Sequence, residues 1–131
     1  MKLQIENITF YRGVSFSKVF TPLANDGSAV DLSTAKARMM IKENQDDEAA
    51  VIDLCTSTSG LEIDAEDDTI TAEITSAQSA AFTIEEGFYD LLIEIDGETF
   101  ISHCGKVRMY KSVTEVPIPD SPPQQPGPGE A

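Results

Sequence analysis

Apolar residues recur at every second position in several short runs of this chain, and polar residues fill the alternate positions. Because successive side chains of a β-strand point to opposite faces of a sheet, this period of two predicts strands with one buried face. The three clearest runs contribute ten apolar side chains: Ala37, Met39 and Ile41; Ile70, Ala72 and Ile74; and Tyr89, Leu91, Ile93 and Ile95. We expect these ten side chains to share one core between two sheets.

Turn-forming residues divide the chain into roughly eight or nine segments of strand length. The expected strands lie at about residues 8–12, 14–20, 36–42, 51–55, 61–63, 70–75, 89–95, 100–104 and 107–113. The stretch 25–28 is rich in turn-forming residues, and Asp96 with Gly97 is a pair that type I′ hairpins favour. Gly105 is expected to mark a β-bulge or a bend.

One segment departs from the period of two. Ser76 is a candidate helix N-cap, and the alanine-rich residues 77–81 that follow it predict one short helical turn between two strands. The pattern therefore predicts an all-β fold, an antiparallel Ig-like β-sandwich with one short helical turn. A Greek-key barrel is the alternative.

The composition changes near the C-terminus. Residues 115–131 contain six prolines and two glycines but no aromatic residue, which is too little apolar surface to form a core. We therefore divide the chain into a β-sandwich domain at 1–114 and an extended, Pro/Gly-rich C-terminal arm at 115–131. We expect this arm to become ordered only when it binds a partner. The arm contains two Pro-x-x-Pro spacings, but no Lys or Arg flanks them, which favours a spacer or docking arm over an SH3-domain ligand.

The chain carries 23 Asp and Glu residues against 9 Lys and Arg, a formal net charge of −14. Phosphate binding requires clustered Lys and Arg, so this balance argues against nucleic acid and against anionic membrane surfaces as partners. The amino-terminal residues lack an apolar signal region, and no stretch reaches the length of a membrane span. We therefore expect the protein to remain in the cytoplasm or in a structure assembled there.

The charges are unevenly distributed along the sequence. Between Glu43 and Gly105 there are seventeen acidic residues and no basic one, whereas the two flanking regions hold nine basic and six acidic residues. One interpretation is that the acids are spread over every face and confer solubility. The other is that copies stack, with a basic side against an acidic side. Early and late strands of the sandwich would then unite a candidate assembly patch of six residues: Lys36, Arg38, Lys42, Lys106, Arg108 and Lys111.

The residues that could carry catalysis form no recognised motif. His103 is the only histidine, and it cannot pair with Cys104, because neighbouring strand residues point to opposite faces. We expect a surface or half-buried histidine without a catalytic role. Cys55 and Cys104 belong to no CxxC motif, and in a reducing compartment they are expected as buried thiols rather than as a disulfide.

An acidic segment has part of the pattern of a calcium loop. Asp64, Glu66 and Asp68 alternate as the first ligands of such a loop do, but the mid-loop glycine is missing and position twelve is Thr75, which cannot bind bidentately. We expect a solvated hairpin here, with weak calcium binding as the alternative. The sequence thus predicts no catalytic residue, no cofactor site and no metal site, and the protein is not expected to be an enzyme.

The order of turn and strand residues resembles that of small Ig-like β-sandwich proteins of tailed bacteriophages. The resemblance is carried by Phe-Tyr-Arg-Gly-Val-Ser-Phe at 10–16, Asp-Gly-Ser-Ala-Val-Asp-Leu at 26–32 and Gly-Phe-Tyr-Asp-Leu at 87–91, with further matches at 37–42, 60–64, 70–74, 76–77, 80 and 105–107. It covers about residues 9–114. Val14 stands where relatives often have an acidic residue, and Ala29 where proline is common, and neither change alters the expected fold.

Proteins of this kind occur in tail, neck or baseplate parts and at the amino ends of fibre proteins. The resemblance therefore implies a virion structural protein, a multi-copy assembly component that binds neighbouring virion proteins and copies of itself and is assembled in the host cytoplasm. It implies a homo-oligomer and no catalytic residues. A capsid decoration protein on the head surface is one alternative. A carbohydrate-binding adhesion module is another, which the absence of Trp and the small number of Tyr disfavour.

Overall fold

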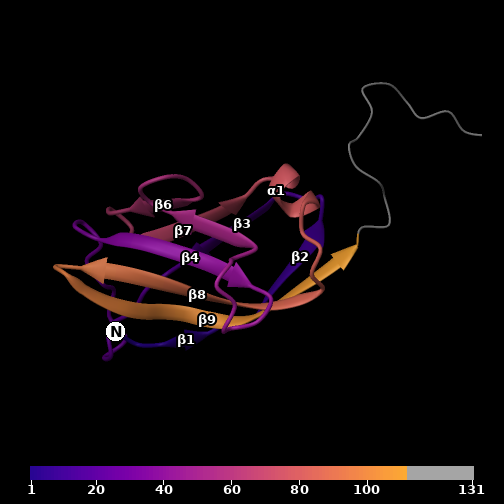
Figure 1. Cartoon of the computed structure of the whole chain (residues 1–131). Coiled ribbons are helices and arrows are strands. Elements are labelled where there is room, and N and C mark those ends of the chain that lie inside the picture. The colour runs from indigo at the N-terminus through magenta and orange to yellow at the C-terminus, as the bar shows by residue number, and fades with distance from the viewer. Residues whose placement is uncertain (112–131) are drawn as a thin grey trace, which may run out of the picture.

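The computed structural model describes residues 1–111, and the predicted arm at 115–131 lies outside the described residues together with 112–114. The described part consists of nine strands and one short helix (Figure 1). Their bounds are β1 Gln4–Ile5, β2 Ile8–Arg12, β3 Phe16–Phe20, β4 Lys36–Lys42, β5 Ile52–Cys55, β6 Leu61–Asp64, β7 Thr69–Ile74, α1 Ser76–Ala80, β8 Glu86–Ile95 and β9 Glu98–Lys111. The prediction of an all-β fold with one helical turn is confirmed.

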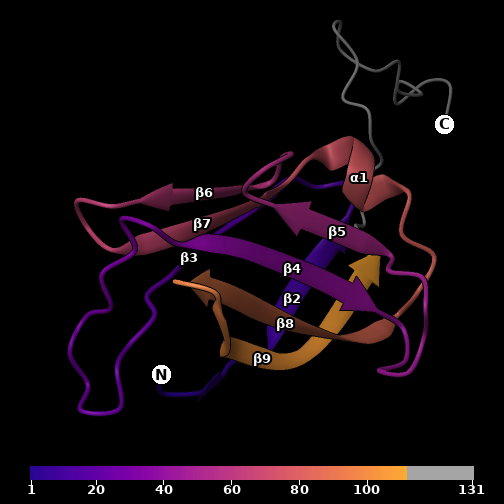
Figure 2. The same cartoon turned by 60° about the vertical axis from the view of Figure 1, so that its left-hand side comes forward.

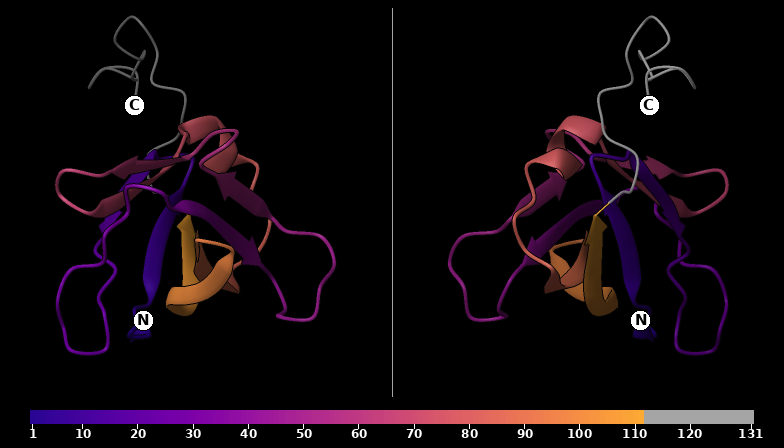
Figure 3. Two further views of the ribbon diagram at one scale, coloured as in Figure 1. Left: turned by 90° about the vertical axis from the view of Figure 1, so that its left-hand side faces the viewer. Right: turned by 90° about the vertical axis from the view of Figure 1, so that its right-hand side faces the viewer.

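The strands form two sheets that pack face to face (Figure 2). The large sheet has six strands in the order β1-β9-β8-β4-β5, with β2 also paired to β9, and the small sheet has the order β3-β7-β6. Because the two sheets are separate, the fold is a β-sandwich and not the barrel of the alternative prediction. The end-on views in Figure 3 show the β3–β4 loop and the β4–β5 loop on opposite sides of the sandwich.

Two strand pairings differ from the antiparallel prediction. Strands β1 and β2 both run parallel to β9, with Gln4 opposite His103 and Ile8 opposite Val107. The other pairings between the described strands are antiparallel. Alternation assigns the two faces of a strand but carries no information on the direction of its neighbour, so these two parallel pairs could not be predicted from it.

The ten predicted core residues face the space between the two sheets. Nine of them are buried, and Ile95 is partly buried against the others. Phe10, Phe20 and Phe82 add aromatic rings to this core, and the rings of Phe10 and Phe82 meet edge to face with 6.0 Å between their centroids. Full burial of a side chain such as Leu91 contributes about 1.5–3 kcal/mol, so this core is the main interaction that holds the sheets together.

Helix α1 has a different N-cap from the one predicted. The Thr75 hydroxyl, not Ser76, accepts a hydrogen bond from the Gln78 amide at 3.1 Å, and the Gln78 side chain accepts one from the Thr75 amide at 2.9 Å. Both hydroxyl residues suit the cap position, but only Thr75 has a glutamine three residues later that completes a capping box. Within residues 1–111 no helix is long and apolar enough to cross a membrane.

The irregularity in β9 lies at Ser102 rather than at Gly105, where it was predicted. The pairing between β8 and β9 shifts there, and Ser102 and His103 are both buried. Glycine is needed at position 105 for a steric reason, because a Cβ atom there would lie 2.2 Å from the backbone oxygen of Glu6. The missing side chain therefore allows the N-terminal segment to pass close to β9.

Candidate interaction surface

The outer face of the large sheet, which points away from the small sheet, carries most of the predicted assembly patch. Five of the six basic residues alternate with buried residues of their strands and project from this face: Lys36, Arg38 and Lys42 from β4, and Lys106 and Arg108 from β9. Lys111 shares the strand parity of the buried Met109 and therefore falls on the other side. Early and late strands do join in one sheet, but β8 lies between β4 and β9.

Acidic residues of β5 and β8 interrupt this patch. Asp53 forms an ion pair with Arg38 at 2.6 Å between Oδ2 and Nη2, and Glu86 forms one with Arg108. The hydrogen bond from Arg38 lowers the pKa of Asp53, and the same interaction raises the pKa of Arg38. The outer face thus carries charges of both signs, and the one continuous basic patch that the sequence predicted does not form.

An apolar groove of about 830 Å³ lies between these charges. Its walls include side chains that alternation places on the solvent side of their strands: Ile5, Met40, Phe88, Leu92 and Ile101. Ile5 is 75% exposed and Ile101 is 45% exposed. This groove was not predicted. The available signals were Leu92, an apolar residue on the face of β8 that Asp90 and Glu94 also occupy, and Met40, which lies on the basic face of β4.

Two lysines flank the groove at the level of Phe88. Lys42 on β4 and Lys106 on β9 are the register partners of Phe88 on its two sides. Their Cα atoms are about 10 Å apart, twice the usual spacing of neighbouring strands. Among the described residues neither lysine forms an ion pair, and Asp90 is the one acidic residue that lines the groove. The groove is therefore locally cationic on a chain whose net charge is −14.

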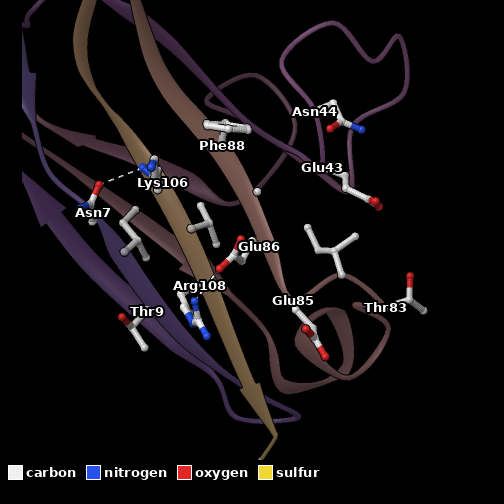
Figure 4. A pocket seen from close by; sticks show the side chains of 14 residues that line it. Asn7, Thr9, Glu43, Asn44, Thr83, Glu85, Glu86, Phe88, Lys106 and Arg108 are labelled. Carbon is white, nitrogen blue, oxygen red and sulfur yellow. Dashed lines mark hydrogen bonds and ion pairs between the residues drawn. The ribbon is translucent and has the colours of Figure 1, made fainter.

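A second hollow of about 770 Å³ adjoins the groove and shares Asn7, Phe88 and Lys106 with it. Figure 4 shows that charged side chains of both signs surround this hollow: Glu43, Glu85 and Glu86 with Lys106 and Arg108. The side-chain oxygen of Asn7 accepts a hydrogen bond from the Lys106 amide at 3.0 Å and fixes one edge of it. Since acidic and basic side chains are mixed around it, this hollow offers polar contacts rather than a site for one kind of ion.

His103 and Cys104 point to opposite faces, as the sequence predicts. His103 is not at the surface or half-buried but 2% exposed, and its ring centroid lies 4.8 Å from that of Phe20. The bulge at Ser102 changes which residues of β9 face the core, and burial lowers the pKa of His103. Cys55 and Cys104 are free, half-buried thiols. They lie three strand spacings apart in the large sheet, roughly 14 Å, which is too far for a disulfide.

In the acidic hairpin between β6 and β7, carboxylate oxygens accept hydrogen bonds from backbone amides. Asp64 Oδ1 accepts hydrogen bonds from the amides of Glu66 and Asp67 at 3.0 and 3.2 Å. Asp68 has a φ of 54°, and its Oδ1 accepts a hydrogen bond from the Leu32 amide at 3.2 Å, which connects the hairpin to the segment before β4. In the part of the chain that the structure describes, no group of three potential ligands could hold a metal ion.

The sequence matches no protein-family model and no curated protein. The resemblance to Ig-like sandwich proteins of tailed bacteriophages therefore rests on the residue pattern alone. The geometry of the outer face of the large sheet bears on function without depending on this resemblance.

Proposed function

We propose that this chain is a structural component of a bacteriophage virion, present in several copies in the tail, neck or baseplate. There it binds neighbouring virion proteins and copies of itself, and it acts by assembly rather than by catalysis. It reaches this place by assembly in the host cytoplasm. The observation that carries the proposal is the exposed apolar groove on the outer face of the large sheet.

The groove has the properties of a protein-binding surface. A β-sandwich builds its core from the inner faces of its sheets, and the outer faces are normally polar. Here the outer face exposes clustered apolar side chains, with Ile5 and Ile101 among the most exposed of them. Apolar patches with a polar rim mark interaction sites, and the rim of Lys42, Lys106 and Asp90 supplies the charges that select a partner. The residue pattern shared with phage sandwich proteins supports virion proteins as those partners.

The experiment uses particles produced from the genome that encodes this chain. Purified particles are analysed by quantitative mass spectrometry, and a label on a tagged copy of the protein is located in electron micrographs. We expect several copies per particle, with the label at the tail, neck or baseplate. Label over the head surface would identify a capsid decoration protein instead. Absence of the chain from purified particles would refute the proposal.

A carbohydrate-binding adhesion module is the second candidate, and one observation favours it. Tyr11 and Tyr110 lie side by side on β2 and β9 with 5.9 Å between their ring centroids, and they are 53% and 44% exposed. The Arg108 guanidinium lies 5.5 Å from the Tyr110 ring centroid. Adjacent exposed aromatic rings suit stacking on sugar rings. Binding to a glycan array that is lost on combining Tyr11→Ala with Tyr110→Ala would select this candidate.

A further inference from the structure

We propose that the groove of one copy binds the proline-rich C-terminal arm of a second copy. The part of the arm that makes the contact is 115–120, and the groove receives it between Lys42 and Lys106. The inference rests on the proposed function and deepens it by naming one contact between copies. It is tested on purified protein, so its failure would be distinguishable from a failure to find the chain in particles.

The arm segment and the groove are complementary in chemistry. The four central residues of the segment are apolar: Val116, Pro117, Ile118 and Pro119. Glu115 and Asp120 flank them. The groove has the inverse arrangement, with apolar side chains around Phe88 and the cations Lys42 and Lys106 on its two sides. Proline-rich segments dock into grooves with aromatic side chains because their polyproline II conformation loses little entropy on binding.

The spacing of the charges fits as well. In the polyproline II conformation the five residue steps from Glu115 to Asp120 span about 16 Å. The Cα atoms of Lys42 and Lys106 are about 10 Å apart, and each ammonium group stands on a flexible four-carbon stem that reaches outward. Both ion pairs are therefore able to form while the apolar residues of the segment lie over Phe88.

The direction of β9 favours the arm of a second copy over that of the same chain. After Lys106 the strand runs away from the groove for five residues, roughly 17 Å, to Lys111. Glu115 follows four residues later, a span of at most about 14 Å. Residues 112–114 contain no glycine, proline, asparagine or aspartate, and Ser112 is the one residue there of a type that turns favour. If the chain reversed its direction there, residues 112–115 would be barely long enough to bring Glu115 back to the groove of the same molecule. The arm of a second copy enters the groove without this constraint.

Sedimentation velocity of the full chain tests this contact with two charge-reversed proteins. The groove variant combines Lys42→Glu with Lys106→Glu, and the arm variant combines Glu115→Lys with Asp120→Lys. Each variant alone brings like charges together at the contact, so we expect its self-association to weaken roughly tenfold. An equimolar mixture of the two restores opposite charges between different molecules, and its association should recover toward that of the wild type.

Two further proteins complete the test. Lys36→Glu with Lys111→Glu changes the net charge as the groove variant does, but outside the groove. It adds the same general repulsion, so it should weaken association less than the groove variant does. Ile101→Ala shortens an exposed groove wall without a change of charge, and it should weaken association. A mixture of groove and arm variants no heavier than its components would overturn the inference. So would a wild-type chain that stays monomeric at its highest soluble concentration, or a Lys36/Lys111 control as weak as the groove variant.

Discussion

The imidazole of His103 responds to three kinds of neighbour. Its ring packs against Phe20, and its Nδ1 shares a hydrogen bond of 2.7 Å with the Ser102 hydroxyl. Glu6 and Lys18, which form an ion pair with each other at 3.1 Å, act on it with opposite charges. Burial is the largest influence and favours the neutral ring, so the pKa of His103 lies below the usual value of 6.5.

A lowered histidine pKa makes stability depend on pH. The unfolded chain takes up a proton on His103 near pH 6.5, whereas the folded chain takes it up at lower pH, so unfolding binds a proton between the two values. With respect to His103, the folded state keeps its full stability above pH 6.5, where the ring is neutral in both states. It loses stability as the pH falls toward the folded-state pKa, because only the unfolded chain then gains the proton. In urea denaturation between about pH 7.5 and 5.5, we expect the free energy of unfolding to fall by at most about 1.4 kcal/mol per pH unit.

The matched control for this prediction is His103→Gln. The glutamine side chain still offers a hydrogen-bonding partner to Ser102 but gains no proton. Because His103 is the only histidine of the chain, the variant should show little change of stability over the same pH range. The same pH dependence in both proteins would contradict the role given to His103.

At the scale of elements, β9 organises the large sheet, since it pairs with β8 on one side and with both β1 and β2 on the other. Between β1 and β2 the Glu6 amide donates a hydrogen bond to the Cys104 carbonyl oxygen at 2.9 Å. The Tyr89 hydroxyl donates one to the Glu6 carbonyl oxygen at 2.7 Å. These contacts hold the N-terminal segment against β9 at the point where Gly105 has no side chain.

Gly105→Ala should therefore loosen the N-terminal segment. The added methyl group would lie 2.2 Å from the Glu6 backbone oxygen, so backbone must move, and we expect a loss of stability of about 1–3 kcal/mol. Hydrogen exchange should show that the Glu6 amide loses protection. The control is Gly97→Ala, which strains a residue with a φ of 83° but has no atom within 4 Å of the new Cβ. Equal protection of the Glu6 amide in both variants would refute this explanation.

The sequence predicts an element well when the residue pattern that indicates it lies within the element itself. Strands β4 and β7 are long enough to show alternation, and the sequence located both to within one residue. Strand β1 has only two residues and pairs with His103 and Cys104 near the other end of the chain, so no local pattern reveals it. The bulge at Ser102 likewise depends on the partner strand, because it is defined by the register between β8 and β9.

The candidate interaction surface was predictable only in part for the same reason. Alternation placed Lys36, Arg38 and Lys42 on one solvated face, in agreement with the structure. The strand order could not be deduced from the sequence, so the separation of these residues from Lys106 by β8 was not predicted. The groove combines side chains from four strands, and only Met40 and Leu92 are conspicuous as apolar residues on faces that charged residues of the same strand occupy.

At the scale of the whole molecule, a net charge of −14 opposes association between copies, because like-charged bodies repel. Three ion pairs in the described part neutralise basic residues within the chain: Lys18 with Glu6, Arg38 with Asp53 and Arg108 with Glu86. Six basic residues of the described part form no ion pair, and Lys42 and Lys106 are the two of them that line the groove. The proposed attraction between copies must therefore come from local contacts, and contacts between exposed charges weaken as salt shortens the Debye length.

The salt dependence of association distinguishes local attraction from overall repulsion, provided that the two variants compared have the same net charge. The groove variant and a protein with Arg38→Glu and Arg108→Glu each replace two cations by two anions, so their general repulsion is the same. The predicted continuous patch would make both variants equally weak. In the structure the two arginines are already paired with Asp53 and Glu86, so we expect the groove variant to associate more weakly at low salt.

The difference between the two variants should vanish near 1 M salt, where the Debye length is about 3 Å and exposed ion pairs contribute little. Light scattering over a salt series, on proteins whose unfolding temperatures are unchanged, measures both effects. Equal weakening at low salt would restore the continuous patch as the better description of the surface. A difference that persists at high salt would mean that the two lysines act through the packing of their alkyl stems on the groove and not through their charge.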